Sequence, residues 1–285
     1  MTDRMFGQEA RAAFARLYPE EAGTIAHGLA DHPLFAMESL VRLAGRMRPA
    51  DVERNLADLP IGVDPDAVRE NGLSVADTIR SIERNGSWMV LKFVEQDPEY
   101  RALLDAVLDE IEPLVAPRTG AMLKREGFIF VSSPGAVTPF HFDPEHNILL
   151  QIRGTKTMHV FPAGDEGTAG PELHERFHMG GHRNLPYHDG FAALGTAHHL
   201  SPGRAIYVPV KAPHWVKNGP EPSVSFSMTW RSEWSYREAD AHGFNHLARK
   251  AGITPRAPGR FPRQNRAKSL AYRAIGKARR TLDRA

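Results

Sequence analysis

His141 and Asp143 stand two residues apart in the stretch Gly135-Ala-Val-Thr-Pro-Phe-His-Phe-Asp143. If this stretch is a β-strand, the two side chains point to the same face and Phe142 points to the other. One imidazole and one carboxylate on one face supply two members of a 2-His-1-carboxylate metal site, the ligand set typical of non-haem Fe(II) oxygenases. In a chain with 14 histidines such a pair also arises by chance, so an ordinary hydrogen-bonded pair is the alternative.

A second stretch, residues 203–219, supplies a candidate for the third ligand. It contains the strand-like run Ala-Ile-Tyr-Val at 205–208, then prolines, then His214, and it closes on Asn218-Gly219. This order predicts a short strand, a proline-punctuated turn and a closing turn. His214 would then complete the metal site from a distant strand; the alternative is a histidine packed in the core.

The two stretches resemble the paired motifs of the cupin superfamily, with Gly135 and Gly203 at the family's spacing before the ligands. Two positions depart from the cupin pattern: Asn147 stands where many cupins place a glutamate ligand, and Lys211 stands where the second motif has glycine. The first departure is typical of JmjC-like oxygenases, in particular the branch resembling the asparaginyl hydroxylase of the hypoxia-inducible factor. The resemblance covers roughly residues 125 to 232, and the positions that match the branch are Thr138, Pro139, His141, Asp143, Asn147 and Lys156.

The resemblance implies an Fe(II)- and 2-oxoglutarate-dependent hydroxylase, in which decarboxylation of 2-oxoglutarate to succinate is coupled to hydroxylation of a substrate. It places iron on His141, Asp143 and His214. A carboxylate buried in a barrel needs a cation and hydrogen bonds. The matching positions assign these roles to Lys156 as the cation, with Thr138 and Asn147 as further cosubstrate-binding residues. For Lys156 the alternative is a solvent-facing residue of a hairpin turn.

A second function of a different class stays open, namely a cupin-fold protein that binds a metal or small ligand for regulation and performs no catalysis. The motifs do not separate iron from manganese, nickel or zinc, which accept similar ligands. Nor do they separate a small-molecule substrate from a protein side chain, because the stretches that would select the substrate carry no motif.

Composition limits the class of protein. The chain has 285 residues, of which 41% are hydrophobic and 25% charged, as in ordinary soluble globular proteins. It has no cysteine, which excludes disulfides and thiolate ligands. The N-terminus lacks the apolar run of a signal peptide, and no stretch is long and apolar enough to span a membrane. We therefore expect a cytoplasmic protein.

The elements that must position the ligands are short strands. Residues 1–86 show helical periodicity, and residues 87–245 carry regularly punctuated β runs after one further helix. With the cupin motifs, this pattern predicts a mainly β protein: a double-stranded β-helix, or jelly roll, with an N-terminal helical region and a C-terminal helical tail. The metal site would lie at the mouth of the barrel.

A long insertion is expected at about 163–202, between the two motifs. His174, His178 and His182 recur there at four-residue intervals and on a helix would line one face. A second metal site is one interpretation, but Gly180 and Gly181 interrupt a helix, so a polar loop over the barrel is favoured.

Residues 246–285 form a basic tail with twelve Lys or Arg and one acid, Asp283. The remaining residues are acidic, with 24 Lys or Arg against 33 Asp or Glu. A proline-rich linker precedes a predicted basic amphipathic helix that starts after Asn265. Docking on the chain itself or formation of a homodimer is the first interpretation. Binding of nucleic acid or of an anionic membrane is the alternative.

Overall fold

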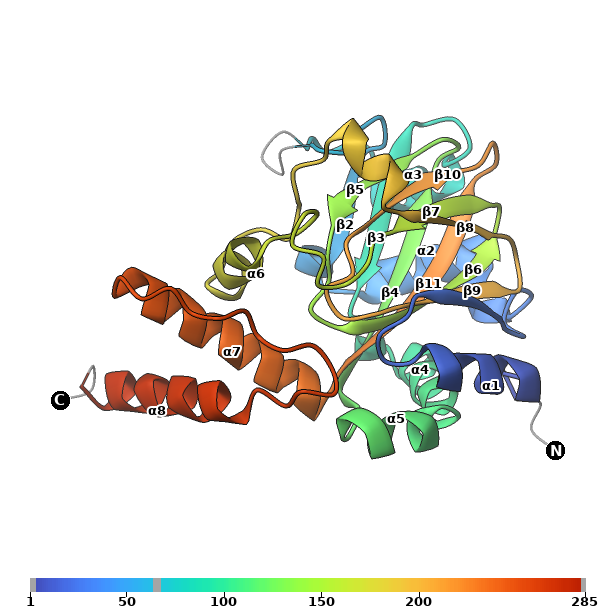
Figure 1. Ribbon diagram of the computed structural model, residues 1–285. Helices are drawn as coiled ribbons and strands as arrows, with labels where there is room; N and C mark the ends of the chain where they lie inside the picture. Colours follow the sequence, from blue (N-terminus) through green and yellow to red (C-terminus); the bar gives the residue numbers. More distant parts are fainter. Residues whose placement is uncertain (1–3, 64–67, 283–285) are drawn as a thin grey trace.

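The computed structural model describes residues 4–63 and 68–282, and two antiparallel sheets dominate it. The larger sheet has seven strands in the order β1-β9-β6-β11-β4-β3-β2, and the smaller has four in the order β5-β10-β7-β8. The strands are β1 (Gly23–Ala26), β2 (Val52–Leu56), β3 (Ser87–Lys92), β4 (Leu123–Ser132), β5 (Val137–His141), β6 (His146–Arg153), β7 (Lys156–Val160), β8 (Thr196–Leu200), β9 (Arg204–Val208), β10 (His214–Asn218) and β11 (Ser223–Arg231). Figure 1 shows the two sheets facing each other, as the jelly-roll prediction requires.

Strand β11 shows how the sequence sorts its residues between the two faces of the larger sheet. Small polar residues at 223, 225, 227 and 229 alternate with Val224, Phe226, Met228 and Trp230. The apolar set joins the main core, which also contains side chains of the surrounding helices. The polar set faces the inside of the barrel, where apolar side chains from both sheets meet in a second cluster. The barrel interior is therefore part polar and part apolar.

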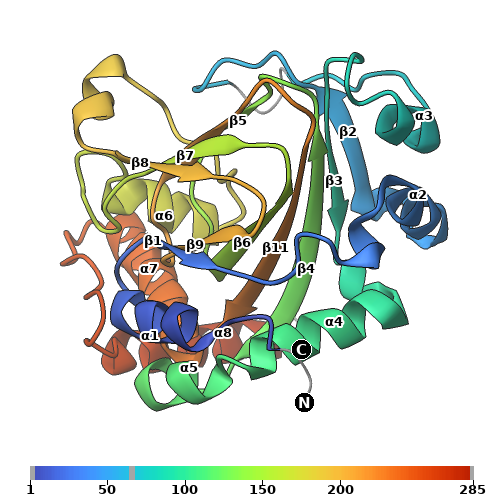
Figure 2. The same cartoon turned by 90° about the vertical axis from the view of Figure 1, so that its right-hand side faces the viewer.

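Helices cover the outer face of the larger sheet. Figure 2 shows α1, α4 and α5 along the lower edge of the view and α2 at its side. Their buried residues, such as Phe14, Leu40, Leu104 and Val115, belong to the same core cluster as Phe226. The helices are α1 (Gln8–Leu17), α2 (Met37–Arg46), α3 (Val75–Arg80), α4 (Pro98–Asp109), α5 (Glu112–Thr119), α6 (Pro171–His178), α7 (Glu233–Lys250) and α8 (Arg266–Leu282).

The N-terminal region is less helical than its sequence predicts. β1 pairs with β9 and β2 pairs with β3, so residues before 87 extend the larger sheet at both edges. Both strands are short, and β2 reads Val-Glu-Arg-Asn-Leu, which has none of the apolar alternation that marks a strand from sequence. Pairing with the partner strand decides the conformation of such a segment.

The insertion between the two motifs is shorter than predicted, because β8 (Thr196–Leu200) pairs with β7 and belongs to the barrel. α6 carries His174 and His178, while His182 follows the helix. Phe177 and Tyr187 of the insertion pack with Phe140 and Phe142 in a third apolar cluster. The insertion is therefore a cover over one edge of the smaller sheet.

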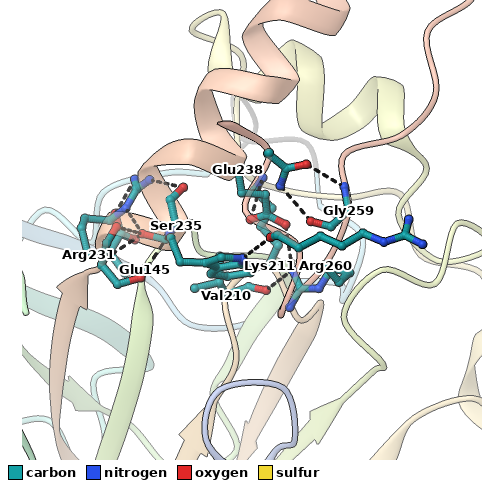
Figure 3. Close-up of polar contacts among 12 residues, drawn as sticks. Glu145, Val210, Lys211, Arg231, Ser235, Glu238, Gly259 and Arg260 are labelled. Carbon is teal, nitrogen blue, oxygen red and sulfur yellow. Dashed lines mark hydrogen bonds and ion pairs between the residues drawn. The ribbon is translucent and has the colours of Figure 1, made fainter. Parts of the chain in front are cut away.

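Helix α7 runs through the predicted boundary at 245/246, and α8 lies beside it and runs parallel to it (Figure 1). Figure 3 shows how the segment between them is fixed to the barrel. Arg260 donates to the carbonyl oxygen of Val210 and to Glu238 Oε1, both at 3.0 Å, and it also pairs with Glu20. Lys211 Nζ lies 3.3 Å from Glu238 Oε2. In this structure the tail docks on its own chain.

No helix within the described ranges combines the length and the apolarity that a bilayer crossing requires.

Candidate metal centre

His141 and His214 are brought together by strand pairing. His141 is the last residue of β5, His214 is the first of β10, and the two are register partners. Their ring centroids lie 4.2 Å apart. Asp143, two residues beyond β5, places Oδ2 3.8 Å from the Nε2 atom of each histidine. Within the described part of the chain, this is the only group of three His, Asp or Glu side chains whose ligand atoms all lie within 4.8 Å of one another.

The two imidazoles are held in the orientation that a metal site needs. His141 Nδ1 lies 2.7 Å from the carbonyl oxygen of Pro139, and His214 Nδ1 lies 2.9 Å from that of Ala212. A carbonyl oxygen only accepts, so each Nδ1 carries the hydrogen and donates it, and a neutral ring then has its lone pair on Nε2. Both Nε2 atoms face Asp143.

Burial and neighbouring charges favour a neutral His141 beside an ionised Asp143. Burial lowers the pKa of His141, and the nearby His214 lowers it further, against the opposing charge of Asp143. Burial alone would raise the pKa of Asp143, but Arg183 and the two imidazoles outweigh it and lower that pKa. Two imidazole nitrogens and one ionised carboxylate oxygen are a suitable donor set for a divalent transition metal.

Arg183 of the insertion completes the surroundings of Asp143. Its guanidinium donates to Asp143 Oδ1, which leaves Oδ2 directed at the histidines. Asn184 forms an isolated β-bridge with His141, and Leu185 N donates to the carbonyl oxygen of Phe140. This short segment therefore runs beside the edge strand that carries the first ligand. No feature of the sequence marks Arg183, because its position depends on the path of the insertion.

A β-bulge places Thr138 on the inner face of the smaller sheet. His141 pairs with His214, but the next partner on the inner face, Val216, pairs with Thr138, so β5 has one extra residue at this point. Val216 is buried in the interior cluster. Thr138 and His141 consequently share the inner face although their spacing in an unbroken strand would separate them.

Lys156 lies deeper on the same inner face. Val160 of β7 is the register partner of His214, and Lys156 stands four residues earlier on that strand, about 13 Å away along it. Its side chain is 6% exposed. Burial lowers the pKa of Lys156 to about 7, and no carboxylate in the described ranges pairs with it. The solvent-facing alternative for Lys156 is therefore wrong, and its ammonium lacks a counter-ion.

Asn147 comes from the opposite sheet. On β6 it is the register partner of Val208 on one side and of Thr229 on the other, and it is buried. Ser227 Oγ donates to Asn147 Oδ1 at 2.8 Å, so the amide oxygen is engaged and the NH₂ group is the end that can donate to a ligand.

Glu145 adds an acidic group near the metal ligands that the sequence did not indicate. Burial raises its pKa to about 7, and the charge of Asp143 contributes in the same direction. Arg231 lies 3.9 Å away and opposes this shift (Figure 3).

His174, His178 and His182 do not form a second centre, since no further group of three ligands within the described ranges meets the same distance criterion. The ring of His178 instead lies 5.6 Å from that of His242 on α7, and the ring of His174 lies 5.3 Å from it. These rings join the insertion to α7.

Known proteins support this description of the fold. No family model matches the chain. It is 31% identical over 101 residues to JmjC domain-containing protein D of Dictyostelium discoideum, a match that covers 33% of this chain and 22% of that protein. The chain thus aligns with about a fifth of that relative's length.

Among solved structures, the chain matches E. coli YcfD with a TM-score of 0.52 and 17% identity, over 93% of this chain and 66% of that one. A structure of YcfD described as a ribosomal oxygenase, in complex with cobalt and 2-oxoglutarate, matches with a TM-score of 0.50 and 16% identity, over 95% of this chain and 67% of that one. Assignment to the branch of the asparaginyl hydroxylase stays a prediction. The chain has a jelly-roll fold like that of YcfD, and over 101 residues its sequence resembles that of a JmjC domain-containing protein.

Proposed function

We propose that this protein is an Fe(II)- and 2-oxoglutarate-dependent oxygenase that hydroxylates its substrate. One observation carries the proposal: the inner face of the smaller sheet holds both a converging His-Asp-His group and, further along, a buried lysine without a counter-ion. The first suits a metal and the second suits an anion. The YcfD structure with cobalt and 2-oxoglutarate shares this fold and supports the same pairing of ligands.

The residues present fit iron. His141, Asp143 and His214 supply two nitrogens and one oxygen and leave room for further ligands, as a facial triad does. The chain has no cysteine to favour a closed thiolate site. The carbonyl partners of the two Nδ1 atoms and the guanidinium of Arg183 orient the ligands from outside, which in metal sites raises affinity.

The residues also fit a dicarboxylate. Lys156 would pair with the carboxylate far from the metal, since a buried ammonium without a partner is unfavourable and an anion offsets that penalty. Thr138 and Asn147 offer a hydroxyl and an amide NH₂ on the inner faces of the two sheets. When bound, iron and 2-oxoglutarate supply the oxygen chemistry: dioxygen is consumed, 2-oxoglutarate yields succinate and carbon dioxide, and one oxygen atom enters a C–H bond of the substrate.

The protein's own contribution is to position these groups and to exclude water. Apolar residues from both sheets fill the barrel beside the inner-face polar groups, including Leu149, Met158 and Ile206. A low-dielectric interior strengthens the pairing of Lys156 with an anion. Because one solved neighbour is described as a ribosomal oxygenase, a protein side chain is the substrate class that we favour over a free small molecule.

Iron-loaded protein incubated with 2-oxoglutarate and oxygen tests the proposal. Oxygenases of this type release some succinate without their substrate, so we expect succinate above the level of a His141→Ala control. A protein that binds Mn²⁺ and 2-oxoglutarate but releases no succinate above that control would instead be a cupin-like regulatory binding protein. Succinate release separates the two outcomes, and calorimetry shows that 2-oxoglutarate binds in either case.

A further inference from the structure

Helix α8 presents a row of cations along its solvent-exposed side. The helix contains six Lys or Arg residues and no Asp or Glu between Arg266 and Leu282. Successive residues of an α-helix are rotated by about 100° and rise by about 1.5 Å. Arg266, Arg273, Lys277 and Arg280 consequently fall within about 60° of one another, in a row about 21 Å long. We call these four residues the basic row.

The adjoining side of α8 is already occupied by α7. Ser269 Oγ donates to Asp240 Oδ2 at 2.6 Å, and Lys268 Nζ donates to Asn245 Oδ1 at 2.7 Å. The ring of Tyr272 lies so close to Gly243 that a side chain at 243 would collide with it. The orientation of α8 is therefore set by its contacts with α7, and the basic row is held on the solvent-exposed side of the helix that adjoins these contacts, where Arg273 also reaches Asp240.

Few of the positive charges in the basic row are paired with acidic side chains of the same chain. Arg273 pairs with Asp240 at 2.6 Å and remains 60% exposed. Arg266, Lys277 and Arg280 are exposed and form no ion pair with any residue that the structure describes. The body of the chain before residue 246 is acidic, with 24 Lys or Arg and 33 Asp or Glu. Figure 1 shows α7 and α8 projecting to one side of the barrel.

We propose that the basic row binds the phosphate backbone of a nucleic acid without regard to base sequence. A series of like cations along one line suits a polymer with regularly spaced anions, because each contact releases counter-ions from it. The exposed positions described on α8 include no aromatic residue on which a base could stack. This favours contacts with phosphates over contacts with bases.

An anionic membrane fits this surface less well. Helices that lie in a membrane interface bury an apolar face opposite their cations. Among the α8 side chains that the structure describes, the exposed side has one large apolar residue, Leu270, which is 69% exposed, and the remaining apolar positions on that side are alanines. Tyr272 is turned toward α7 and Met179. A surface of this kind offers cations without an apolar face to insert.

The test measures binding of the full-length protein to fluorescein-labelled RNA and DNA, single-stranded and duplex, of about 20 nucleotides, in about 50 mM salt. The test variant is Arg266→Gln/Lys277→Gln/Arg280→Gln. The matched control, Arg84→Gln/Arg101→Gln/Arg153→Gln, removes three exposed cations from the body and changes the net charge equally. Glutamine is a good helix former, so circular dichroism is expected to show both variants folded.

We expect the wild type and the control to bind at least one of these nucleic acids, and affinity to fall about a hundredfold between about 50 and 200 mM salt. The α8 variant is expected to bind at least ~10-fold more weakly, with a salt slope shallower by about two to three. Equal binding by the two triple variants would overturn the inference. So would a wild type that ignores nucleic acid but binds phosphatidylserine vesicles or polyglutamate, or that forms a dimer through this surface.

The inference does not depend on the oxygenase proposal. α8 contributes no residue to the metal centre, so release of succinate without substrate is expected to be the same in the α8 variant and the wild type.

Discussion

A buried lysine without a carboxylate partner is unfavourable for folding, and Lys156 is such a residue. The protein retains it on the inner face of the barrel, where the metal ligands also lie. The arrangement is understandable if an anion occupies the space beside it during function. Lys156 then lowers the stability of the free protein but strengthens anion binding. Its replacement should therefore raise the free energy of unfolding and weaken binding, and both effects can be measured.

Lys156→Met is expected to weaken 2-oxoglutarate binding by roughly thirtyfold to several thousandfold, equivalent to roughly 2–5 kcal/mol for the loss of a buried charge partner. The same change is expected to raise the free energy of unfolding by about 1 kcal/mol or more, because the buried charge is removed. Calorimetry and urea unfolding give the two values. Lys217→Met on the neighbouring strand, where the side chain is exposed, is the control and should change neither. Unchanged affinity in Lys156→Met would remove this residue from the site.

The lowered pKa of Lys156 also predicts a pH dependence. Below about pH 7 the side chain is charged in the folded protein and binds the anion at full strength. As pH rises above that value the free protein loses the proton, so affinity for 2-oxoglutarate should fall by up to about tenfold per pH unit. The unfolded chain keeps its proton up to the ordinary pKa of 10.5, so this lysine's penalty to folding is greatest below pH 7 and shrinks between the two values. An affinity that stays flat from pH 7 to 9 would contradict the assignment.

Arg183 is a positioning residue for the metal ligand Asp143. Its removal frees Asp143 Oδ1 and withdraws the charge that helps to keep the carboxylate ionised. Arg183→Ala is expected to weaken Co²⁺ binding by about 10–100-fold, as removal of outer partners does in other metal sites. The absorption spectrum of bound cobalt measures this directly. Arg176→Ala, an exposed arginine of the same insertion, should bind as the wild type does, and equal loss in both variants would mean that the insertion is merely disturbed.

At the scale of elements, the site depends on two irregularities in otherwise regular strands. The bulge in β5 brings Thr138 to the inner face, and the turn between β6 and β7 fixes where β7 begins, two residues after Gly154. Gly154 has φ +67°. A side chain there would collide with the backbone carbonyl of Pro222, so the turn requires glycine for space as well as for conformation.

Gly154→Ala is therefore expected to lower the free energy of unfolding by about 2–4 kcal/mol and to weaken 2-oxoglutarate binding by displacing Lys156. Gly72→Ala is the matched control, because Gly72 has a similar φ of +72° but open space around its Cα. The control should lose only about 1 kcal/mol, the conformational part. Chemical unfolding of both variants separates the cost of the collision from the cost of the backbone strain. Equal losses in the free energy of unfolding would show that the structure accommodates the alanine side chain at 154 without further cost.

At the scale of the whole molecule, the sequence predicted the barrel and the three converging ligands, because paired motifs and period-two alternation depend on local spacing. It did not predict β1 and β2, whose conformation depends on pairing with β9 and β3. Nor did it predict Arg183 or Glu145 beside the ligands, since their positions follow from the path of loops. The length of α7 was also missed, although Ser232 forms a capping box with Ser235 at its start. These features depend on contacts between segments that are distant in the sequence, so the sequence alone does not reveal them.

The C-terminal segment illustrates this dependence on distant contacts, because Arg260 joins it to Glu20 near the N-terminus and to Glu238 and Val210 beside the barrel. Arg260→Met removes all of these bonds and leaves Glu238 with Lys211 as its remaining ion-pair partner among the described residues. We expect the free energy of unfolding to fall by about 2–4 kcal/mol, somewhat less than for fully buried ion pairs because Arg260 is 22% exposed. Trypsin should also cut after Arg256 and Arg263 faster than in the wild type, while Lys277→Met, an exposed change outside the segment and outside these contacts, should leave cleavage at these two sites unchanged. If Arg260→Met were cut no faster, the segment would be held by its other contacts, such as the bond from Trp234 Nε1 to the carbonyl oxygen of Arg263.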